Sequence, residues 1–132
     1  MAWHTKFETG NTQIDNQHKE IFTLVGQIID ANYTCQGKIK AAIDFLTNYA
    51  VTHFEYEERL MDESVYPMAH IHKKQHSDFV ASVAALAKRV SNENDDVKNR
   101  ADIEEVAFNW LVDHVLGSDK VMASHYRKWA SK

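Results

Sequence analysis

The residues of this chain most suited to chemistry begin with His53 and Glu57, which stand four positions apart in the longest helical pattern. At that spacing the two side chains lie on one face of a helix, about one turn apart. That face runs through Ile39, Ile43, Leu46, Ala50, His53, Glu57 and Leu60, and all of its other residues are apolar. A buried carboxylate is unfavourable unless it is paired or binds a metal. The position of Glu57 therefore predicts a partner elsewhere in the chain.

Histidines on the inner faces of three other predicted helices are the candidate partners: His18, His72, His76 and His114. A single histidine on an apolar face is usually a core residue whose ring nitrogens are hydrogen-bonded. Five such histidines need more polar partners than apolar faces provide, because each buried ring nitrogen must be satisfied. A shared metal satisfies several of them at once, so the pattern favours a metal site.

Asp119 is a second candidate carboxylate, and its spacing leaves two interpretations open. The predicted inner face of its helix runs through Ile103, Ala107, Trp110, His114 and Gly117. Asp119 follows His114 by five residues, which is roughly 140° around a regular helix of 3.6 residues per turn. It points inward only if the helix loosens, and Gly117 and Ser118 stand where this could happen. Alternatively, Ser118 or Asp119 only caps a last helical segment.

The number and types of donors favour a pair of metal ions. Five histidines and two carboxylates exceed the four ligands that one zinc ion takes. Mixed nitrogen and oxygen donors favour iron, manganese or a related transition metal over magnesium or calcium. No glutamate has a histidine three residues after it, which argues against the usual di-iron carboxylate oxidases and ferritins. The sequence also lacks a His-Glu-x-x-His motif, a glycine-rich phosphate loop and a nucleophile elbow.

Four helices are needed to position these side chains, and the three- and four-residue spacing of apolar residues predicts them. We expect these helices, and a weaker helical segment after them, at about residues 15–37, 38–63, 69–90, 99–116 and 119–129. Asp15 is a good N-cap, Gly37 is a natural stop, and Pro67 breaks the chain after the second helix. We expect an irregular arm at residues 1–14 and a surface loop at residues 91–96.

The predicted fold class is all-α. Short connections make consecutive helices antiparallel, which gives an up-down-up-down four-helix bundle with an N-terminal irregular arm and a short C-terminal segment. In this arrangement His18 lies early in the first helix and His53 lies late in the second. His72 and His76 lie early in the third helix, and His114 lies late in the fourth. All five histidines therefore converge at one end of the bundle.

The composition limits the class of protein further. The chain of 132 residues is long enough for one domain, which we expect to span residues 1–132. A net charge of −4 gives no basic surface for nucleic acid, and no apolar run is long enough for a membrane span. The single Cys35 cannot form an internal disulfide, and the N-terminus lacks a signal-peptide core. We therefore expect a cytoplasmic protein that neither enters membranes nor binds nucleic acid.

Four ordered motifs resemble those of the hemerythrins, most closely the small single-domain bacterial form. They are Ile14-Asp-Asn-Gln-His18, His53-Phe-Glu-Tyr-Glu57-Glu, His72-Lys-Lys-Gln-His76-Ser-Asp-Phe79, and Trp110-Leu-Val-Asp-His114 followed by Asp119. The resemblance spans nearly the whole chain and fills all seven ligand positions. It implies a four-helix bundle that holds two non-haem iron ions joined by an oxo or hydroxo bridge.

The resemblance also implies a role for each residue. One iron would be bound by the three histidines of the third and fourth helices, and the other by His18 and His53. Glu57 and Asp119 would bridge the two ions, and dioxygen would bind at an open position on the two-histidine iron. Four apolar residues beside the ligands would wall that position: Ile21, Phe54, Trp110 and Val115. Such walls exclude water and leave few acids or bases near the gas; alternatively, these residues are ordinary core.

Three functions are compatible with such a centre. The first, which we favour, is reversible dioxygen binding without catalysis, for oxygen storage, transport or delivery to an oxygen-using client enzyme. The second is a di-iron enzyme with peroxidase-like or nitric-oxide-reducing activity. The third is an oxygen or redox sensor that acts through a separate partner. The apolar pocket and the absence of an obvious proton donor favour the first, and the sequence indicates no oligomeric state.

Overall fold

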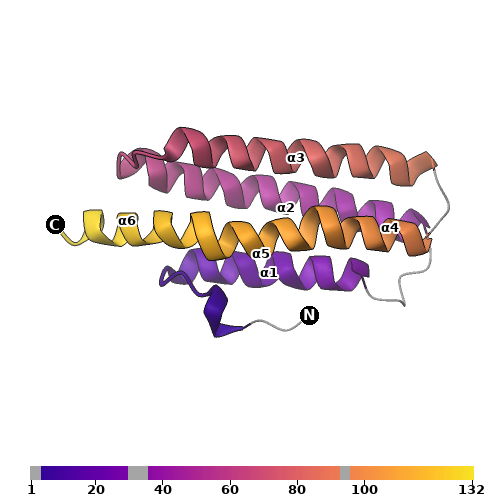
Figure 1. Cartoon of the computed structure of the whole chain (residues 1–132), viewed down its shortest axis with the longest axis horizontal. Helices are drawn as coiled ribbons and strands as arrows, with labels where there is room; N and C mark the ends of the chain where they lie inside the picture. Colours follow the sequence, from indigo (N-terminus) through magenta and orange to yellow (C-terminus); the bar gives the residue numbers. More distant parts are fainter. Residues whose placement is uncertain (1–3, 30–35, 93–95) are drawn as a thin grey trace.

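The computed structural model describes residues 4–29, 36–92 and 96–132, and its helices pack side by side as a bundle (Figure 1). Three long helices come first: α1 (Thr12–Ile29), α2 (Gln36–Glu63) and α3 (Ala69–Asn92). The fourth side is a helical run of five consecutive segments: α4 (Asp96–Ile103), η2 (Glu104–Asn109), α5 (Trp110–His114), η3 (Val115–Asp119) and α6 (Lys120–Ala130). A short 3₁₀ turn, η1 (Thr5–Phe7), precedes α1. The described residues contain no strand, so the predicted all-α four-helix bundle is confirmed.

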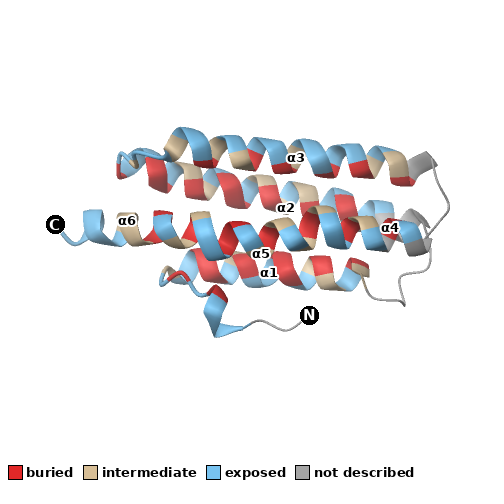
Figure 2. Cartoon of the chain, in the orientation of Figure 1, coloured by how far each residue is buried: buried red, intermediate tan, exposed pale blue. Residues whose placement is uncertain are grey.

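Successive helices of the bundle run in opposite directions (Figure 1), and each buries one face against its neighbours (Figure 2). The predicted inner face of α2 is buried at Ile43, Leu46, Ala50, His53, Glu57 and Leu60. The side chain of Ile39, which was predicted on the same face, lies outside the described residues. Apolar residues every three or four positions thus located the buried face of α2 correctly.

The N-terminal arm is attached to the bundle at the start of α1. This helix begins at Thr12, so the prediction that Asp15 is its N-cap was wrong. Asn11 is the cap, because its Oδ1 accepts a hydrogen bond of 3.0 Å from the backbone N–H of Ile14. The buried Asp15 side chain accepts bonds of 2.8 Å from both the backbone N–H and the hydroxyl of Thr9. Asp15 therefore fastens the arm to the helix.

Two other predicted boundaries also differ from the structure. Gly37, predicted as the stop of the first helix, lies in the first turn of α2. Glycine is found at both ends of helices, so this residue alone did not distinguish a stop from a start. The predicted loop at residues 91–96 is shorter, because α3 extends to Asn92 and α4 begins at Asp96. Cys35 lies outside the described residues.

The fourth helix does not end near Leu116 as predicted but continues to Ala130. The segment predicted as a separate C-terminal element is therefore the end of this helix. Two stretches within it, η2 and η3, are π-helical, with backbone hydrogen bonds that span five residues instead of four. Gly117 was predicted on the inner face, but it is exposed, because η3 changes the phase of the helix between His114 and Asp119.

Two apolar clusters lie along the bundle with a polar layer between them. The larger one extends through every helix of the bundle, and the smaller one consists of Ile14, Leu60, Met61, Met122 and Ala123. On α1, His18 lies between Ile14 of the smaller cluster and Ile21 of the larger cluster. On α2 and on the fourth helix, the candidate metal-binding residues likewise lie between residues of the two clusters. The candidate metal-binding side chains are therefore shielded by apolar side chains on both sides.

The turn that joins α2 to α3 contains Val65, whose φ of +51° lies in the left-handed region. This conformation is unfavourable for a β-branched residue. The turn is also fastened to α6, because Nε2 of His125 lies 2.9 Å from the backbone oxygen of Ser64. The turn thus holds the start of α3 close to the C-terminal part of the bundle.

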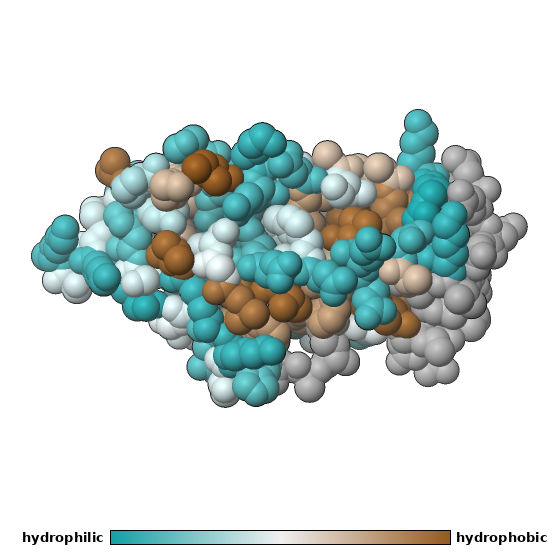
Figure 3. Space-filling model, in the orientation of Figure 1, coloured by the Kyte–Doolittle hydropathy of each residue, from teal (hydrophilic) through white to brown (hydrophobic). Residues whose placement is uncertain are grey.

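The outer surface is mixed in polarity. On the face drawn in Figure 3, apolar side chains form separate patches among hydrophilic ones. Within the described part of the chain, no helix is both long enough and apolar enough to cross a membrane.

Candidate metal centre

All seven side chains predicted to bind metal lie in the polar layer between the two apolar clusters. Each of them is 6% exposed or less: His18, His53, Glu57, His72, His76, His114 and Asp119. The histidines come from α1, α2, α3 and α5, and the carboxylates come from α2 and η3. The four sides of the bundle therefore all contribute to one buried cluster.

Glu57 presents one carboxylate oxygen to each of two groups of histidines. Its Oε1 lies 3.0 Å from Nε2 of His76 and 3.4 Å from Nε2 of His72. Its Oε2 lies 2.9 Å from Nε2 of His53 and 3.4 Å from Nε2 of His18. The carboxylate thus lies between the two groups.

Asp119 is placed in the same way. Its Oδ1 lies 3.0 Å from Nε2 of both His72 and His114, and its Oδ2 lies 2.9 Å from Nε2 of His18. The donor atoms therefore form two groups, and within each group they lie within 4.8 Å of one another. One group contains Glu57, His72, His76, His114 and Asp119, and the other contains His18, His53, Glu57 and Asp119. Both groups share the two carboxylates.

The buried donor atoms face one another without forming hydrogen bonds. Nε2 of all five histidines and both oxygens of each carboxylate have no hydrogen-bond partner among the described residues. Their separations are short enough for hydrogen bonds, but the directions are wrong for a donor and an acceptor. Lone pairs that converge on common points and have no hydrogen bonds fit a site for cations. The residues present therefore fit a pair of bound metal ions.

The charges of the cluster shift the pKa values of its members. Burial lowers the pKa of His18, but contacts with Asp119 and Glu57 outweigh it and raise the pKa from 6.5 to about 10. The same opposing effects raise the pKa of His72 to about 9. Burial raises the pKa of Glu57, but the surrounding histidines, His53 first, hold it well below its usual range. Without metal, protons on His18 and His72 balance the charges of the two carboxylates.

The orientation of Asp119 follows from the π-helical segment η3. In this segment a residue five positions after His114 returns to the same face of the helix, as a residue four positions later would in an α-helix. The Asp119 side chain forms no capping hydrogen bond at the start of α6, so the interpretation that Asp119 is a cap was wrong. The helix was expected to loosen at Gly117 and Ser118, and both residues lie within this π-helical segment.

Two partners of the histidines were missed by sequence reasoning. Nδ1 of His53 lies 2.5 Å from Oε1 of Gln17, and Nδ1 of His76 lies 3.0 Å from Oε2 of Glu58. Such partners orient the ring and direct Nε2 toward a metal. Each contact joins two helices, α1 to α2 and α2 to α3. Spacing along one helix carries no signal for contacts of this kind.

The comparison with known protein families agrees with this geometry. Residues 9–126 match the family described as the hemerythrin HHE cation binding domain. The chain belongs to the hemerythrin family. The expected resemblance is therefore confirmed by the family match and, for the bacterial form, by a bacteriohemerythrin relative.

Individual relatives of this hemerythrin-family chain cover most of its length. It is 32% identical over 123 residues to a bacteriohemerythrin of Pseudomonas aeruginosa, covering 90% of this chain and 76% of the relative. A myohemerythrin of Theromyzon tessulatum is 29% identical over 117 residues, covering 89% and 86%. A crystal structure of wild-type hemerythrin superposes with a TM-score of 0.84 at 31% identity, covering 96% of this chain and 97% of that one.

Two of the four predicted pocket residues stack on histidines of this hemerythrin-family site. The ring of Phe54 stacks on His76 with centroids 3.9 Å apart, and Trp110 stacks on His114 at 4.3 Å. The centroids of these two aromatic rings lie 6.1 Å from each other. The other two predicted residues are buried in the larger apolar cluster: Ile21 and Val115. Apolar side chains therefore cover the donor cluster on the side of the larger apolar cluster.

Proposed function

We propose that this chain binds dioxygen reversibly at a non-haem di-iron centre and serves in oxygen storage or delivery. The observation that carries this proposal is the pair of donor groups that share Glu57 and Asp119. A carboxylate with one oxygen toward each group suits two adjacent ions better than one. The nitrogen-rich donor set favours iron over magnesium or calcium, and the resemblance of the motifs to hemerythrins implies both iron and dioxygen.

In this proposal one iron is held by the three histidines of α3 and α5: His72, His76 and His114. The other iron would be held by His18 and His53, which is one histidine fewer. Glu57 and Asp119 belong to both donor groups and would supply carboxylate oxygens to both ions. The whole chain then acts as a single hemerythrin-like domain, with an oxygen-using enzyme as its client.

The side chains of the chain determine what such a centre does. A ferrous pair supplies two electrons to dioxygen and takes them back when the gas leaves. Ile21, Phe54, Trp110 and Val115 exclude water from the donor cluster, and none of them has an acidic proton. These side chains offer few groups that could donate a proton to bound oxygen, so the gas would be released unchanged. The same wall favours a carrier over an enzyme.

A gas-exchange experiment tests this function. Anaerobic protein loaded with two ferrous ions is exposed to dioxygen, the visible spectrum is recorded, and the gas is then removed. A visible absorption band that appears with dioxygen and disappears on its removal, through repeated cycles, is the expected result. Rapid conversion to a diferric form that does not recover would instead favour a di-iron enzyme. Binding of one metal per chain would overturn the assignment of the centre.

A further inference from the structure

The outer ring nitrogens of two buried histidines have partners of different charge. Nδ1 of His53 contacts the amide oxygen of Gln17 at 2.5 Å, whereas Nδ1 of His76 contacts a carboxylate oxygen of Glu58 at 3.0 Å. An amide oxygen and an ionised carboxylate only accept, so each Nδ1 donates its hydrogen and each Nε2 keeps its lone pair toward the cluster. The Nδ1 partner of His53, on the two-histidine side, is therefore neutral, and that of His76, on the three-histidine side, is acidic.

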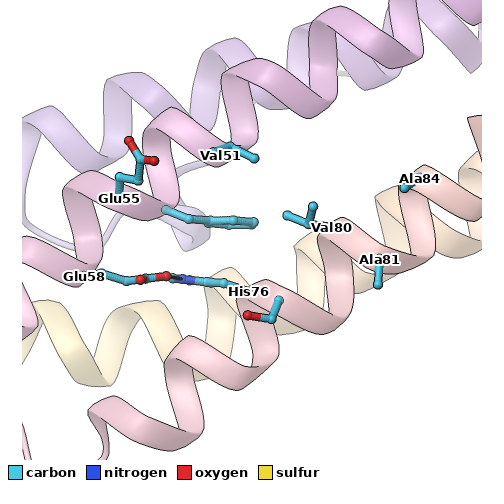
Figure 4. Close-up of a pocket in the computed structure, with 9 residues that line it drawn as sticks. Val51, Glu55, Glu58, His76, Val80, Ala81 and Ala84 are labelled. Atoms are coloured by element: carbon cyan, nitrogen blue, oxygen red, sulfur yellow. Dashed lines mark hydrogen bonds and ion pairs between the residues drawn. The ribbon is translucent and has the colours of Figure 1, made fainter.

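Glu58 reaches His76 from a groove between α2 and α3. Figure 4 shows the two side chains next to each other at this groove, which has a volume of about 420 Å³. The Glu58 side chain is 32% exposed, while that of His76 is 2% exposed. The ring of Phe54 lies parallel to the imidazole, with 7° between the planes, and fixes its orientation. The contact thus joins a buried candidate ligand to a partly exposed carboxylate.

We propose that Glu58 is a positioning residue that lowers the reduction potential of the metal on the three-histidine side relative to that of the other metal. A hydrogen bond to a charged acceptor is roughly twice as strong as one to a neutral acceptor. A carboxylate on the outer nitrogen also makes an imidazole a better electron donor to a metal. His76 therefore stabilises the oxidised form of its metal more than His53 does. In the iron-loaded protein, the three-histidine side would therefore be oxidised more easily than the two-histidine side.

This inference rests on the proposed di-iron function, and it adds a role for a residue outside the ligand set. Glu55 provides a control for charge alone, because it lines the same groove as Glu58. No histidine contact involves Glu55 among those found in the described part of the chain. If the reduction potential depends on the hydrogen bond to His76, it should change when Glu58 is replaced and stay the same when Glu55 is replaced.

Three variants and one potential measurement test the proposal. Glu58→Gln keeps an acceptor for His76 but removes the charge, Glu55→Gln removes a neighbouring charge, and Gln17→Glu adds a charge beside His53. The midpoint potential of each iron-loaded protein is measured by spectroelectrochemistry. We expect Glu58→Gln to favour the reduced state by about tenfold, which equals about 59 mV for one electron. We expect the opposite shift for Gln17→Glu and little change for Glu55→Gln.

A measurement without redox chemistry complements the potential. In zinc-loaded protein, the proton NMR signal of His76 Nδ1–H should move upfield in Glu58→Gln, because its hydrogen bond weakens, and stay in place in Glu55→Gln. Equal potentials in Glu58→Gln and Glu55→Gln, with two irons bound and reversible oxygenation retained, would overturn this inference alone. An unchanged NMR signal in Glu58→Gln would overturn it as well. Loss of oxygen reversibility in the unaltered protein would count against the proposed function instead.

Discussion

Asp119 contacts His114 from five residues further along the same helix, with Oδ1 3.0 Å from Nε2. A regular α-helix would direct these two side chains roughly 140° apart. The π-helical segment η3 removes this difference. It allows one helix to supply both a histidine and a carboxylate to the buried cluster. Glu57 achieves the same relation to His53 with four residues of ordinary α-helix.

Replacing Gly117 tests whether η3 needs the flexibility of glycine. A Cβ at Gly117 would meet nothing within 4 Å, so we expect Gly117→Ala to raise the free energy of unfolding by about 0.5–1 kcal/mol. Denaturant unfolding measures this change, and metal analysis should still find two ions per chain. Gly10→Ala is a control of opposite sign, because Gly10 has a φ of +90° and a Cβ there would collide with Arg127. Loss of metal from Gly117→Ala would show that η3 depends on glycine.

Removing Glu57 should empty the centre without unfolding the bundle. Glu57→Ala deletes a donor shared by both groups, while the two apolar clusters keep their side chains. We expect the iron content to fall from two ions to fewer than one per chain, with an unchanged helical circular dichroism spectrum. His53→Ala should also lower the iron content. Glu55→Ala, an exposed change on the same helix, should leave two irons bound. Full iron content in Glu57→Ala would refute its role as a bridge.

Metal binding should release protons. Without metal, the pKa of His18 is raised to about 10 and that of His72 to about 9, so both carry protons at pH 7. A metal ligand must be the neutral imidazole, so loading should displace about two protons from this pair at pH 7. This contribution should disappear as the pH rises above 10, and metal affinity should weaken as the pH falls. Titration of weakly buffered apoprotein with a pH indicator measures the release.

Opening the apolar wall should speed loss of oxygen. Ile21→Ala removes a buried side chain one turn after His18, and we expect faster oxygen release or autoxidation by stopped-flow spectroscopy. Loss of stability of about 2–5 kcal/mol is also expected for such a change. Ile28→Ala is the matched control, because Ile28 is equally buried on α1 but two turns further from His18. Equal oxygen kinetics in the two variants would show that Ile21 does not wall the site.

Relieving the strained turn should stabilise the protein. Val65 has a φ of +51° and is 79% exposed, so its side chain contributes little packing. The strain of about 1–2 kcal/mol exceeds the entropic disadvantage of glycine, which is about 0.5–1 kcal/mol. Val65→Gly should therefore raise the free energy of unfolding by up to about 1 kcal/mol. In contrast, Val121→Gly, on an exposed face of α6, should lower it by a few tenths of a kcal/mol.

Much of this protein follows from the sequence alone, because burial patterns in helices are local. The side chains of one helical face recur every three or four residues, so Ile43, Leu46 and Ala50 located the buried side of α2. The same spacing put His53 and Glu57 within that face. Antiparallel packing then predicted that the histidines of the different helices lie at one level of the bundle. The structure brings these histidines together.

Other features were decided only by the tertiary structure. The direction of Asp119 depends on a shift in backbone hydrogen bonding, which a spacing of 3.6 residues per turn does not contain. The shift places the carboxylate among histidines whose Nε2 atoms have no hydrogen-bond partner in the described part of the chain. The contact of Glu58 with His76 joins two helices, and its partner is set by how α2 and α3 pack. The spacing of residues along the sequence determines which face of a helix is buried. Only the packing of the helices determines which side chains of different helices contact each other.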